Sequence, residues 1–399
     1  MSLPSVETAR TIMLAGIVPL AAEAVPLAEA DGGWLAEPVT ARRDQPPFDA
    51  SAMDGWAVRG ADVGPGARLE IVGESAAGHD AGVTLHPGQA ARIFTGAALP
   101  PGADRVVIQE EAERDGENVV LTAAPDTPAW VRPRGCDFQA GTVLLEAGTR
   151  LNPWRLALAA SAGRATVVCR RRPVVALLST GDELVAPGTP AGPHQIYDAC
   201  APALTAFVRR SGGTVVHLGP ARDDEASILA AVDGGAFDLL VTVGGASVGD
   251  HDRVKPAIRS AGGRLSVEGV AVRPGKPVWF ARLADGRPLL GLPGNPASAL
   301  VCAELFLGPL IAALQGGLPN LEVDRAVLAG PLAANGPREH YMRAVIETGP
   351  DGVRRARPMT DQDSSLVTVM AAANGLVRRP AGAEGLRTGA EVEVLIPAR

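Results

Sequence analysis

Apolar and polar positions change their spacing along the 399-residue chain, and the changes mark successive stretches. Residues 1–41 begin with the partly periodic apolar segment T-A-R-T-I-M-L-A-G-I-V-P-L, which predicts a helix that prolines interrupt. Residues 42–140 contain short apolar runs of strand length between Gly, Pro and Asp turns, at 69–72, 91–94, 105–109 and 118–121. Residues 141–170 return to strand and helix, and the C-R-R-R-P segment after them predicts a boundary.

Residues 171–318 alternate between apolar strands and helices. The expected strands are 173–178, 214–218, 238–243, 278–281 and 289–290. The expected helices are 199–210, 223–232, 253–261 and 296–314. This alternation predicts a parallel, doubly wound sheet, in which ligands bind outside the carboxyl ends of the strands.

Residues 319–399 lose the helical rhythm. The segments V-D-R-A-V-L-A-G, Y-M-R-A-V-I-E-T-G, N-G-L-V-R-R-P and A-E-V-E-V-L-I-P alternate apolar and polar positions between Gly turns. They predict a small β-barrel or sandwich.

The composition indicates a globular protein of more than one domain and disfavours several other classes of protein. The chain is 46% apolar and 20% charged, which is globular, and it is too long for one hydrophobic core. No secretion signal or uninterrupted membrane span is expected, and four scattered cysteines without C-x-x-C suit a reducing cytoplasm. A net charge of −7 and 4% aromatic residues disfavour nucleic acid as a partner.

Lysine occurs at only two positions, because 35 of the 37 basic residues are arginine. Lys255 follows a Gly-rich segment and Lys276 lies within R-P-G-K-P. A compact cation beside Gly-rich turns is typical of phosphate binding, because an arginine fork does not fit such a site equally well. Chance placement is the alternative.

Five loops follow expected strands and should meet at one edge of the sheet. They are S-T-G-D-E-L (179–184), G-P-A-R-D-D-E (219–225), G-G-A-S-V-G-D-H-D (244–252), R-P-G-K-P (273–277) and G-L-P-G-N-P-A-S-A (291–299). Their glycines expose backbone N–H groups, and Lys255, Arg273 and Lys276 supply positive charge. The carboxylates of Asp182, Glu183, Asp223, Asp224, Asp250 and Asp252 would repel a phosphate unless a cation such as Mg²⁺ bridged them. The set therefore indicates a phosphate-bearing ligand with a divalent metal.

Plainer interpretations stand beside this one. Asp224 alone suits a helix cap, and His251, the only histidine in these loops, suits a bystander. No G-x-S-x-G and no G-x-x-x-x-G-K-[ST] occurs, so a serine hydrolase and a P-loop ATPase have no support.

Taken together, the motifs resemble the MoeA-type molybdopterin molybdenumtransferases, the family that includes the E domain of gephyrin. P-P-F-D-A-S-A-M-D-G-W-A and I-F-T-G-A in the strand-rich stretch occur in the family's order with S-T-G-D-E-L, the G-G-A-S-V-G-D-H-D loop, R-P-G-K-P and G-L-P-G-N-P-A-S-A. The match covers about residues 46–300, and D-S-S-L (363–366) and A-N-G-L (373–376) fit more loosely. Trp56 departs from the family's usual tyrosine.

The resemblance implies a multidomain α/β fold. It comprises a linker region (1–41 and 141–170), an inserted smaller mixed α/β domain (42–140), a doubly wound molybdopterin-binding domain (171–318) and a C-terminal β-barrel-like domain (319–399). The implied reaction is Mg²⁺-dependent insertion of molybdate into adenylylated molybdopterin with release of AMP. The implied assembly is a homodimer whose site combines the α/β domain of one subunit with the inserted domain of the other. A separate adenylyltransferase would supply the substrate, and molybdoenzyme chaperones or apoenzymes are the other implied partners.

The resemblance also assigns roles to residues. Catalytic roles fall to Asp54, Thr95, Glu183, Asp223, Asp252, Lys255 and Lys276, of which Glu183, Asp223 and Asp252 would organise Mg²⁺. Substrate-binding roles fall to Ser179, Thr180, Gly181, Asp182, Gly244, Gly245, Ser247, Gly249, Asp250, Arg273, Pro274, Gly275, Pro293, Gly294, Asn295, Pro296 and Ser298. Two other readings are a scaffold that binds receptor loops and a different Mg²⁺-dependent nucleotidyl or phosphoryl transferase.

Overall fold

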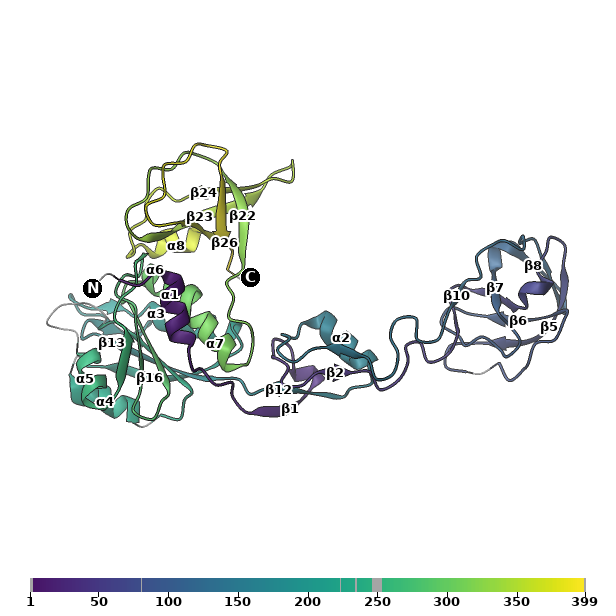
Figure 1. Cartoon of the computed structure of the whole chain (residues 1–399), viewed down its shortest axis with the longest axis horizontal. Coiled ribbons are helices and arrows are strands. Elements are labelled where there is room, and N and C mark those ends of the chain that lie inside the picture. The colour runs from purple at the N-terminus through teal and green to yellow at the C-terminus, as the bar shows by residue number, and fades with distance from the viewer. Residues whose placement is uncertain (1–2, 80, 223, 234, 246–252, 398–399) are drawn as a thin grey trace.

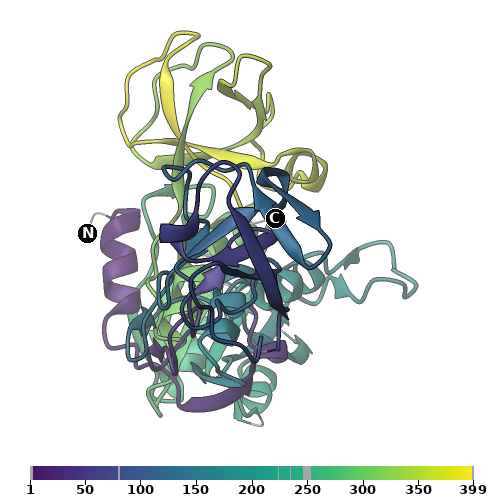
Figure 2. The same cartoon turned by 90° about the vertical axis from the view of Figure 1, so that its right-hand side faces the viewer.

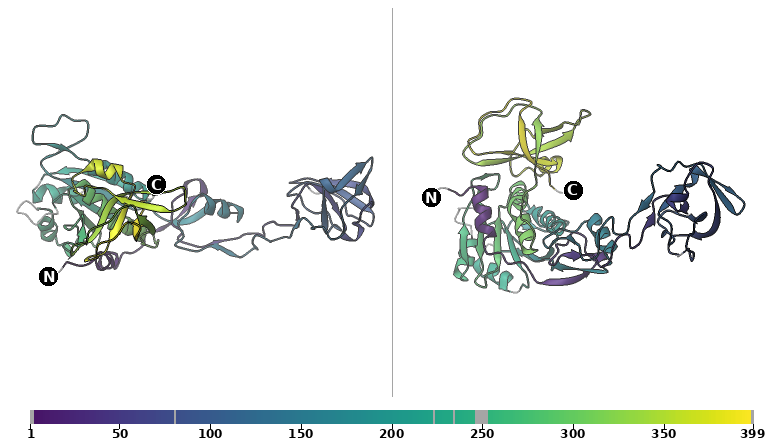
Figure 3. Two further views of the ribbon diagram at one scale, coloured as in Figure 1. Left: turned by 90° about the horizontal axis from the view of Figure 1, so that it is seen from above. Right: turned by 45° about the vertical axis from the view of Figure 1, so that its right-hand side comes forward.

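The computed structural model describes residues 3–79, 81–222, 224–233, 235–245 and 253–397. The chain is elongated (Figure 1): the α/β domain and the C-terminal barrel form one end, the linker region lies in the middle, and the inserted domain forms the other end. The same division is visible from above and from an oblique angle (Figure 3).

The α/β domain is built on a six-stranded sheet of order β16-β13-β17-β21-β20-β18. Its strands are β13 (Val174–Thr180), β16 (Thr214–Ala221), β17 (Leu239–Val243), β18 (Arg264–Val267), β20 (Trp279–Arg282) and β21 (Pro288–Leu292). The first three strands of the order pair in parallel with each other and with β21. Strands β20 and β18 are antiparallel and extend the sheet at one edge. The expected parallel core is confirmed, and the antiparallel edge is an addition that the alternation of strand and helix does not predict.

Helices cover both faces of this sheet, which confirms the doubly wound architecture. On one face, α3 (Cys200–Arg210) and the long helical segment 296–314 form a large core with residues such as Leu204 and Phe306. On the other face, α4 (Glu225–Asp233) and α5 (Val254–Ser260) form a second core that includes Ile228 and Ile258. Strands β17 and β21 are buried throughout, as apolar strands covered on both faces must be.

The helix expected over 296–314 consists of three consecutive segments: α6 (Pro296–Cys302), the π-helical η4 (Ala303–Leu307) and α7 (Gly308–Leu314). Pro309 has no N–H to donate to the carbonyl of Leu305, and the wider π turn lies directly before it. By length and composition this 19-residue helix could cross a membrane, but most of it is buried inside the α/β domain, where it forms part of the core.

The first helix corrects the expectation for residues 1–41. Helix α1 (Val6–Leu14), capped by Ser5, packs Val6, Ala9 and Met13 into the core of the α/β domain and does not join the linker region. These apolar positions at i, i+3 and i+7 form one helical face, so they are buried against the nearest large apolar surface.

The linker region is a small unit with its own core around Leu35, Leu151 and Val167. It contains β1 (Ala22–Pro26), the short 3₁₀ helix η1 (Leu27–Glu29), β2 (Val39–Thr40), β11 (Val143–Leu145), α2 (Pro153–Ser161) and β12 (Thr166–Arg170). Strand β1 pairs with β12 and β2 with β11, so the outgoing and returning segments of the chain run side by side.

The inserted domain is a six-stranded sheet of order β7-β4-β6-β5-β9-β8. Its strands are β4 (Gly55–Val58), β5 (Arg68–Ser75), β6 (Gln89–Ile93), β7 (Arg105–Ile108), β8 (Ala112–Asp115) and β9 (Asn118–Leu121), and β3 (Ala50–Ser51) pairs separately with β10 (Val131–Arg132). The only helices in the described part of 42–140 are the 3₁₀ segments η2 (Gly60–Asp62) and η3 (Gln109–Glu111). The helical content of this strand-rich domain is thus limited to short segments, because Gly and Pro interrupt the stretches between strands too often for a long α-helix.

The C-terminal domain is a closed barrel. Strands β22 (Val323–Leu328), β23 (Glu339–Thr348), β24 (Arg354–Pro358), β25 (Gly375–Arg379) and β26 (Glu391–Leu395) follow the order β23-β24-β22-β26-β25, and β25 pairs with β23 to close it. The short α8 (Val367–Ala372) lies at its base. Strand β19 (Val272–Arg273), which leads into R-P-G-K-P, pairs with β23, so the barrel holds a loop of the α/β domain.

Candidate functional site

Three of the five sequence-predicted loops meet at the carboxyl ends of β13, β17 and β21. Gly244 donates its N–H to the carbonyl of Leu292 at 3.2 Å and lies against Thr180 and Gly294. A Cβ on Gly244 would stand 2.5 Å from the Thr180 carbonyl oxygen, and the backbone φ of +91° also favours glycine. Close packing of the loop backbones therefore requires glycine here.

Asp198 joins the end of β13 to the start of α3. Its carboxylate accepts a hydrogen bond from Ser179 Oγ at 2.6 Å and from the N–H groups of Cys200 and Ala201 at 3.0 and 2.9 Å. None of the loop motifs in the sequence includes this residue, although an aspartate two residues before a helix is a recognisable capping signal. Between β13 and Asp198, the chain makes an arm that carries β14 (Leu184–Val185) and β15 (Ile196–Tyr197) and projects from the body (Figure 2).

The predicted acidic residues divide into three groups. Glu183 and Asp182 are exposed beside β13, and the Glu183 carboxylate folds back over Gly181, where a Cβ would stand 2.6 Å from it. Asp224 caps α4 by accepting from Ser227 N and Oγ, both at 2.8 Å, which is the plainer interpretation of that residue. The other three acidic candidates, Asp223, Asp250 and Asp252, lie outside the described residues, as do Ser247, Gly249 and His251.

No complete metal centre is visible in the part of the chain that the structure describes. Within those residues no group of three or more His, Cys, Asp and Glu side chains could hold an ion. Of the three residues assigned to Mg²⁺, only Glu183 is described, and its exposed oxygens are donors of the kind that Mg²⁺ prefers.

The two lysines occupy different surroundings. Lys255, in the first turn of α5, is only 9% exposed, and its Nζ lies 5.9 Å from the centre of the Trp279 ring. Lys276 is exposed in the R-P-G-K-P loop, next to exposed Arg273 on β19. The loop presents these two cations to solvent, as a site for an anionic ligand requires.

Gly275 sets the shape of that loop. A Cβ at this position would stand 2.2 Å from Cys302 Sγ, and its φ is +109°. We expect Gly275→Ala to displace the loop, to destabilise the protein by about 1–3 kcal/mol and to reduce activity. Gly286→Ala is the matched control, because Gly286 has a φ of +90° but open space around it. Urea unfolding and an activity assay would measure both effects, and equal losses in the two variants would contradict the role of the Cys302 contact.

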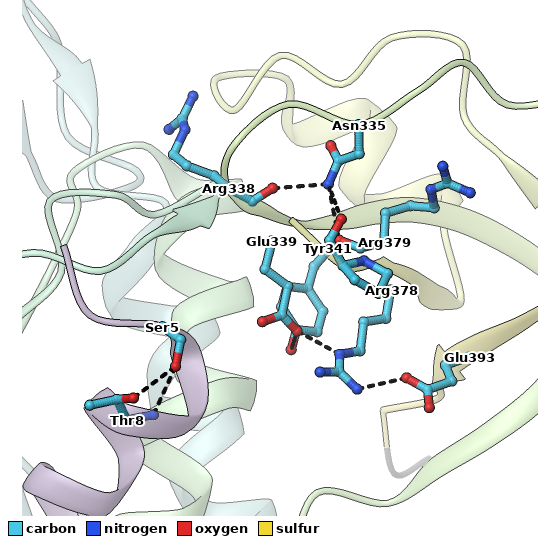
Figure 4. A network of polar contacts seen from close by, with 10 residues as sticks. Ser5, Thr8, Asn335, Arg338, Glu339, Tyr341, Arg378, Arg379 and Glu393 are labelled. Atoms are coloured by element: carbon cyan, nitrogen blue, oxygen red, sulfur yellow. Dashed lines mark hydrogen bonds and ion pairs between the residues drawn. The ribbon is translucent and has the colours of Figure 1, made fainter. Parts of the chain in front are cut away.

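A cavity of about 500 Å³ lies between the R-P-G-K-P loop and the barrel. Its walls include Arg273, His340 and Arg379, together with acidic Asp361 and Asp363. Asn335 shapes its rim (Figure 4), because its Nδ2 donates to the carbonyls of Arg338, Arg379 and Pro380 at 2.9, 3.1 and 2.7 Å. The same view shows Arg378 bonded to Glu339 and Glu393, beneath this rim.

Arg343 follows the cavity-lining residue Met342 on β23 and is completely buried. Its Nη2 donates to the Asp363 carbonyl at 3.0 Å, but Nε and Nη1 have no hydrogen-bond partner. His340 Nε2 is also buried without a partner. Unpaired buried donors cost stability, so this cluster is built for something other than the stability of the barrel.

His340 gives a pH prediction. Burial first, and then the charges of Arg273, Arg343, Arg338 and Arg379, lower its pKa to about 4. Between pH 6.5 and about 4 the unfolded chain binds a proton that the folded chain does not, so stability should fall as the pH falls through this window. Urea unfolding at pH 7 and pH 5 would measure the difference, which should shrink in His340→Gln but persist in the control His79→Gln at an exposed position. An unchanged pH dependence in His340→Gln would contradict this.

The barrel also contacts the P-G-N-P loop directly. Asn295 Nδ2 donates to Ser364 Oγ at 2.9 Å, and the Ser364 carbonyl accepts from Ala297 N–H at 3.2 Å. Neighbouring Ser298 is buried and Pro296 begins α6, whereas Gly294 and Asn295 are exposed. Ser364, in the loosely matching D-S-S-L segment, thus fixes a loop that the sequence assigns to substrate binding.

Asp54 and Thr95 form a pair in the inserted domain. Asp54 Oδ1 accepts from Thr95 N at 2.7 Å and from Thr95 Oγ1 at 2.8 Å. These two bonds, with a smaller contribution from the charge of Arg92, hold the pKa of the Asp54 carboxyl below its usual range. The pair and the α/β loops lie at opposite ends of one chain (Figure 1), so a single chain does not bring them together.

Comparison with known proteins agrees with this arrangement. The chain matches the MoeA N-terminal region (domain I and II) over residues 4–163, a probable molybdopterin binding domain over 176–313 and the MoeA C-terminal region (domain IV) over 325–396. The molybdopterin molybdenumtransferase of Nostoc sp. is 37% identical over 385 residues, which cover 94% of this chain and 88% of its own. That of Bacillus subtilis is 35% identical over 91% of this chain and 87% of its own.

Among solved structures, a molybdopterin biosynthesis MoeA protein from Pyrococcus horikoshii superimposes with a TM-score of 0.81 at 32% identity. The superposition covers 99% of both chains. The chain therefore belongs to the MoeA family of molybdopterin molybdenumtransferases.

Proposed function

We propose that this chain catalyses Mg²⁺-dependent insertion of molybdate into adenylylated molybdopterin, with release of AMP. Membership of the family supports molybdenumtransferase activity and the two substrates. The observation that carries the rest is a cavity lined by Arg273 and Arg379, whose wall residue Asp363 precedes the Ser364 that bonds to Asn295 in the loop after β21. An oxyanion and a phosphorylated ligand can then lie next to each other.

Adenylylated molybdopterin belongs on the loops of the α/β domain. The glycine-lined junction of Thr180, Gly244 and Gly294 lets a ligand approach the backbone closely, and Lys276 would neutralise phosphate charge. Cleavage of the phosphoanhydride P–O bond to AMP depends mainly on charge neutralisation and positioning. Lys255, whose surroundings are apolar on the Trp279 side, would act with Lys276 on the same phosphates.

Molybdate belongs in this cavity, beside its arginine side chains. It is a dianion, and Arg273 and Arg379 line the cavity while Arg343 adds charge from behind its wall. The buried Arg343 guanidinium, which lacks hydrogen-bond partners at Nε and Nη1, adds positive charge near the cavity and so favours an anion there. Binding there would hold the metal oxyanion close to the R-P-G-K-P loop, at which the ligand's phosphates would lie.

The Mg²⁺ requirement rests on chemistry and resemblance. Glu183 offers exposed carboxylate oxygens at the end of β13, and Asp223 and Asp252 are its expected companions. When bound, Mg²⁺ would offset the charge that develops on the leaving phosphate. Glu183 also has to be correctly oriented, and its carboxylate rests against Gly181, which has no side chain to displace it.

We also propose a homodimer. The Asp54–Thr95 pair presents an ionised carboxylate in the inserted domain, at the opposite end of the molecule from the α/β loops. A second copy placed alongside would bring this pair to the α/β loops. A separate adenylyltransferase would deliver the substrate, apoenzymes or their chaperones would accept the product, and the cytoplasm is the expected compartment.

AMP release from adenylylated molybdopterin tests the proposal. The purified dimer should release AMP only when molybdate and Mg²⁺ are both present, and EDTA should stop the release until Mg²⁺ is restored. Release without molybdate would indicate an ordinary hydrolase. Turnover of a plain nucleotide without any pterin would indicate a different phosphoryl transferase.

A further inference from the structure

We propose that Arg92 is a positioning residue that holds the Asp54–Thr95 pair in the orientation in which it completes the site of a second copy of the chain. Arg92 lies on β6 directly opposite Trp56 on β4, two residues before Phe94. This inference rests on the proposed function, because it takes Asp54 to act in the reaction.

The aromatic rings fix the direction of the Arg92 side chain. Its Cζ lies 5.4 Å from the centre of the Trp56 ring and 4.9 Å from that of the Phe94 ring. Trp56 is 5% exposed, so its ring is held in place by the domain core. An indole attracts a guanidinium more strongly than a phenol does, which gives a physical purpose to tryptophan where the family usually has tyrosine.

The guanidinium fork then secures the backbone around Asp54. Nη1 donates to the carbonyl of Gly55 at 2.9 Å, and Nη2 donates to Oε1 of Gln109 at 3.0 Å. Gln109 in turn donates its N–H to the carbonyl of Asp54 at 3.1 Å. Arg92 and Gln109 therefore hold the carbonyls of two consecutive residues, Asp54 and Gly55.

Thr95 is linked to Arg92 through its neighbour Phe94. It follows Phe94, whose ring contacts Arg92, and it donates twice to Asp54. Arg92 thus contacts both segments that carry the pair, 54–56 on one side and 92–95 on the other. Loss of the guanidinium would leave Asp54 and Thr95 bonded to each other but would remove the bond to the Gly55 carbonyl and the contact with the Phe94 ring that help to orient the pair.

Arg105 provides a matched comparison in the same domain. Its Nη1 also donates to backbone carbonyls, those of Pro125 and Thr127 at 2.9 Å each. It pairs with Val58, at the opposite end of β4 from Asp54. Arg105→Gln should therefore perturb the domain without perturbing the Asp54–Thr95 pair.

A double-mutant cycle tests the proposal in the full-length dimer, with molybdate-dependent AMP release as the rate. Arg92→Gln should lower kcat about tenfold, on the scale of one lost charge-assisted hydrogen bond, with KM little changed. Arg92→Lys should recover part of the loss, because it keeps the charge over the rings. In the Asp54→Ala background, Arg92→Gln should cost nothing further, since residues that act as a unit are not additive.

The outcomes separate the hypotheses. Losses that multiply in the double variant, or an equal loss in Arg105→Gln, would show that Arg92 acts only on the stability of the domain and would overturn the inference. In that case an inactive Asp54→Ala would still support the proposed function. A normal rate in Asp54→Ala would overturn both this inference and the part proposed for Asp54.

Discussion

Lys276→Ala is expected to slow molybdate-dependent AMP release about 100- to 1,000-fold, the scale seen when one preorganised charge donor is removed from an active site. The side chain is exposed on a loop that Gly275 and Cys302 hold rigidly, so its removal should leave the fold intact. Lys276→Arg should recover only part of the rate, because a planar fork does not replace a compact ammonium. Steady-state kinetics with each substrate would measure both variants.

A control and a complementation experiment sharpen this result. Arg325→Ala removes a cation from an exposed ion pair with Glu391 on the barrel, and it should change neither rate nor stability appreciably. If the site is shared between two copies, mixed dimers of Lys276→Ala and Asp54→Ala chains contain one intact site and should regain activity that neither variant shows alone. Inactive mixed dimers would contradict the shared site, and a normal rate in Lys276→Ala would contradict the phosphate site.

Arg343→Met is expected to raise KM for molybdate about tenfold or more while leaving the protein as stable or about 1–2 kcal/mol more stable. The guanidinium is completely buried and makes one hydrogen bond through its side chain, to the Asp363 carbonyl, so its desolvation is poorly compensated. Methionine occupies a similar volume without the unpaired donors. Urea unfolding gives the stability change, and AMP release against molybdate concentration gives KM.

Arg378 is the matched control in the same barrel. It bonds to Glu339 and Glu393 through different nitrogens, so its charge is compensated on both sides. Arg378→Met should destabilise the protein, because it leaves Glu339 beside Tyr341 without its cation, and it should not change KM for molybdate. A large loss of stability in Arg343→Met with an unchanged KM would instead assign Arg343 a structural role.

Much of the architecture could be predicted from local patterns. The apolar segments at β13 and β17 are strands because they are buried on both faces, and the alternating segments at β22 and β26 are barrel strands with one buried face. The features that were missed or corrected depend on long-range packing. Helix α1 belongs to the α/β domain because a core far along the chain accepts Val6 and Met13, and β19 is a strand only because β23 lies beside it.

For the candidate site too, some features follow from the local sequence and others from long-range packing. Residue types and spacing in the sequence alone led to the prediction of which loops carry chemistry, because glycine, lysine and carboxylates there have few structural uses in such combinations. Only the tertiary structure decided that Thr180, Gly244 and Gly294 meet, that Asp198 and Ser364 fix these loops, and that Arg273, His340 and Arg379 line one cavity. The reason is that the side chains of a loop are given by its own short sequence. The residues that surround the loop depend on how strands and domains distant in the chain pack together.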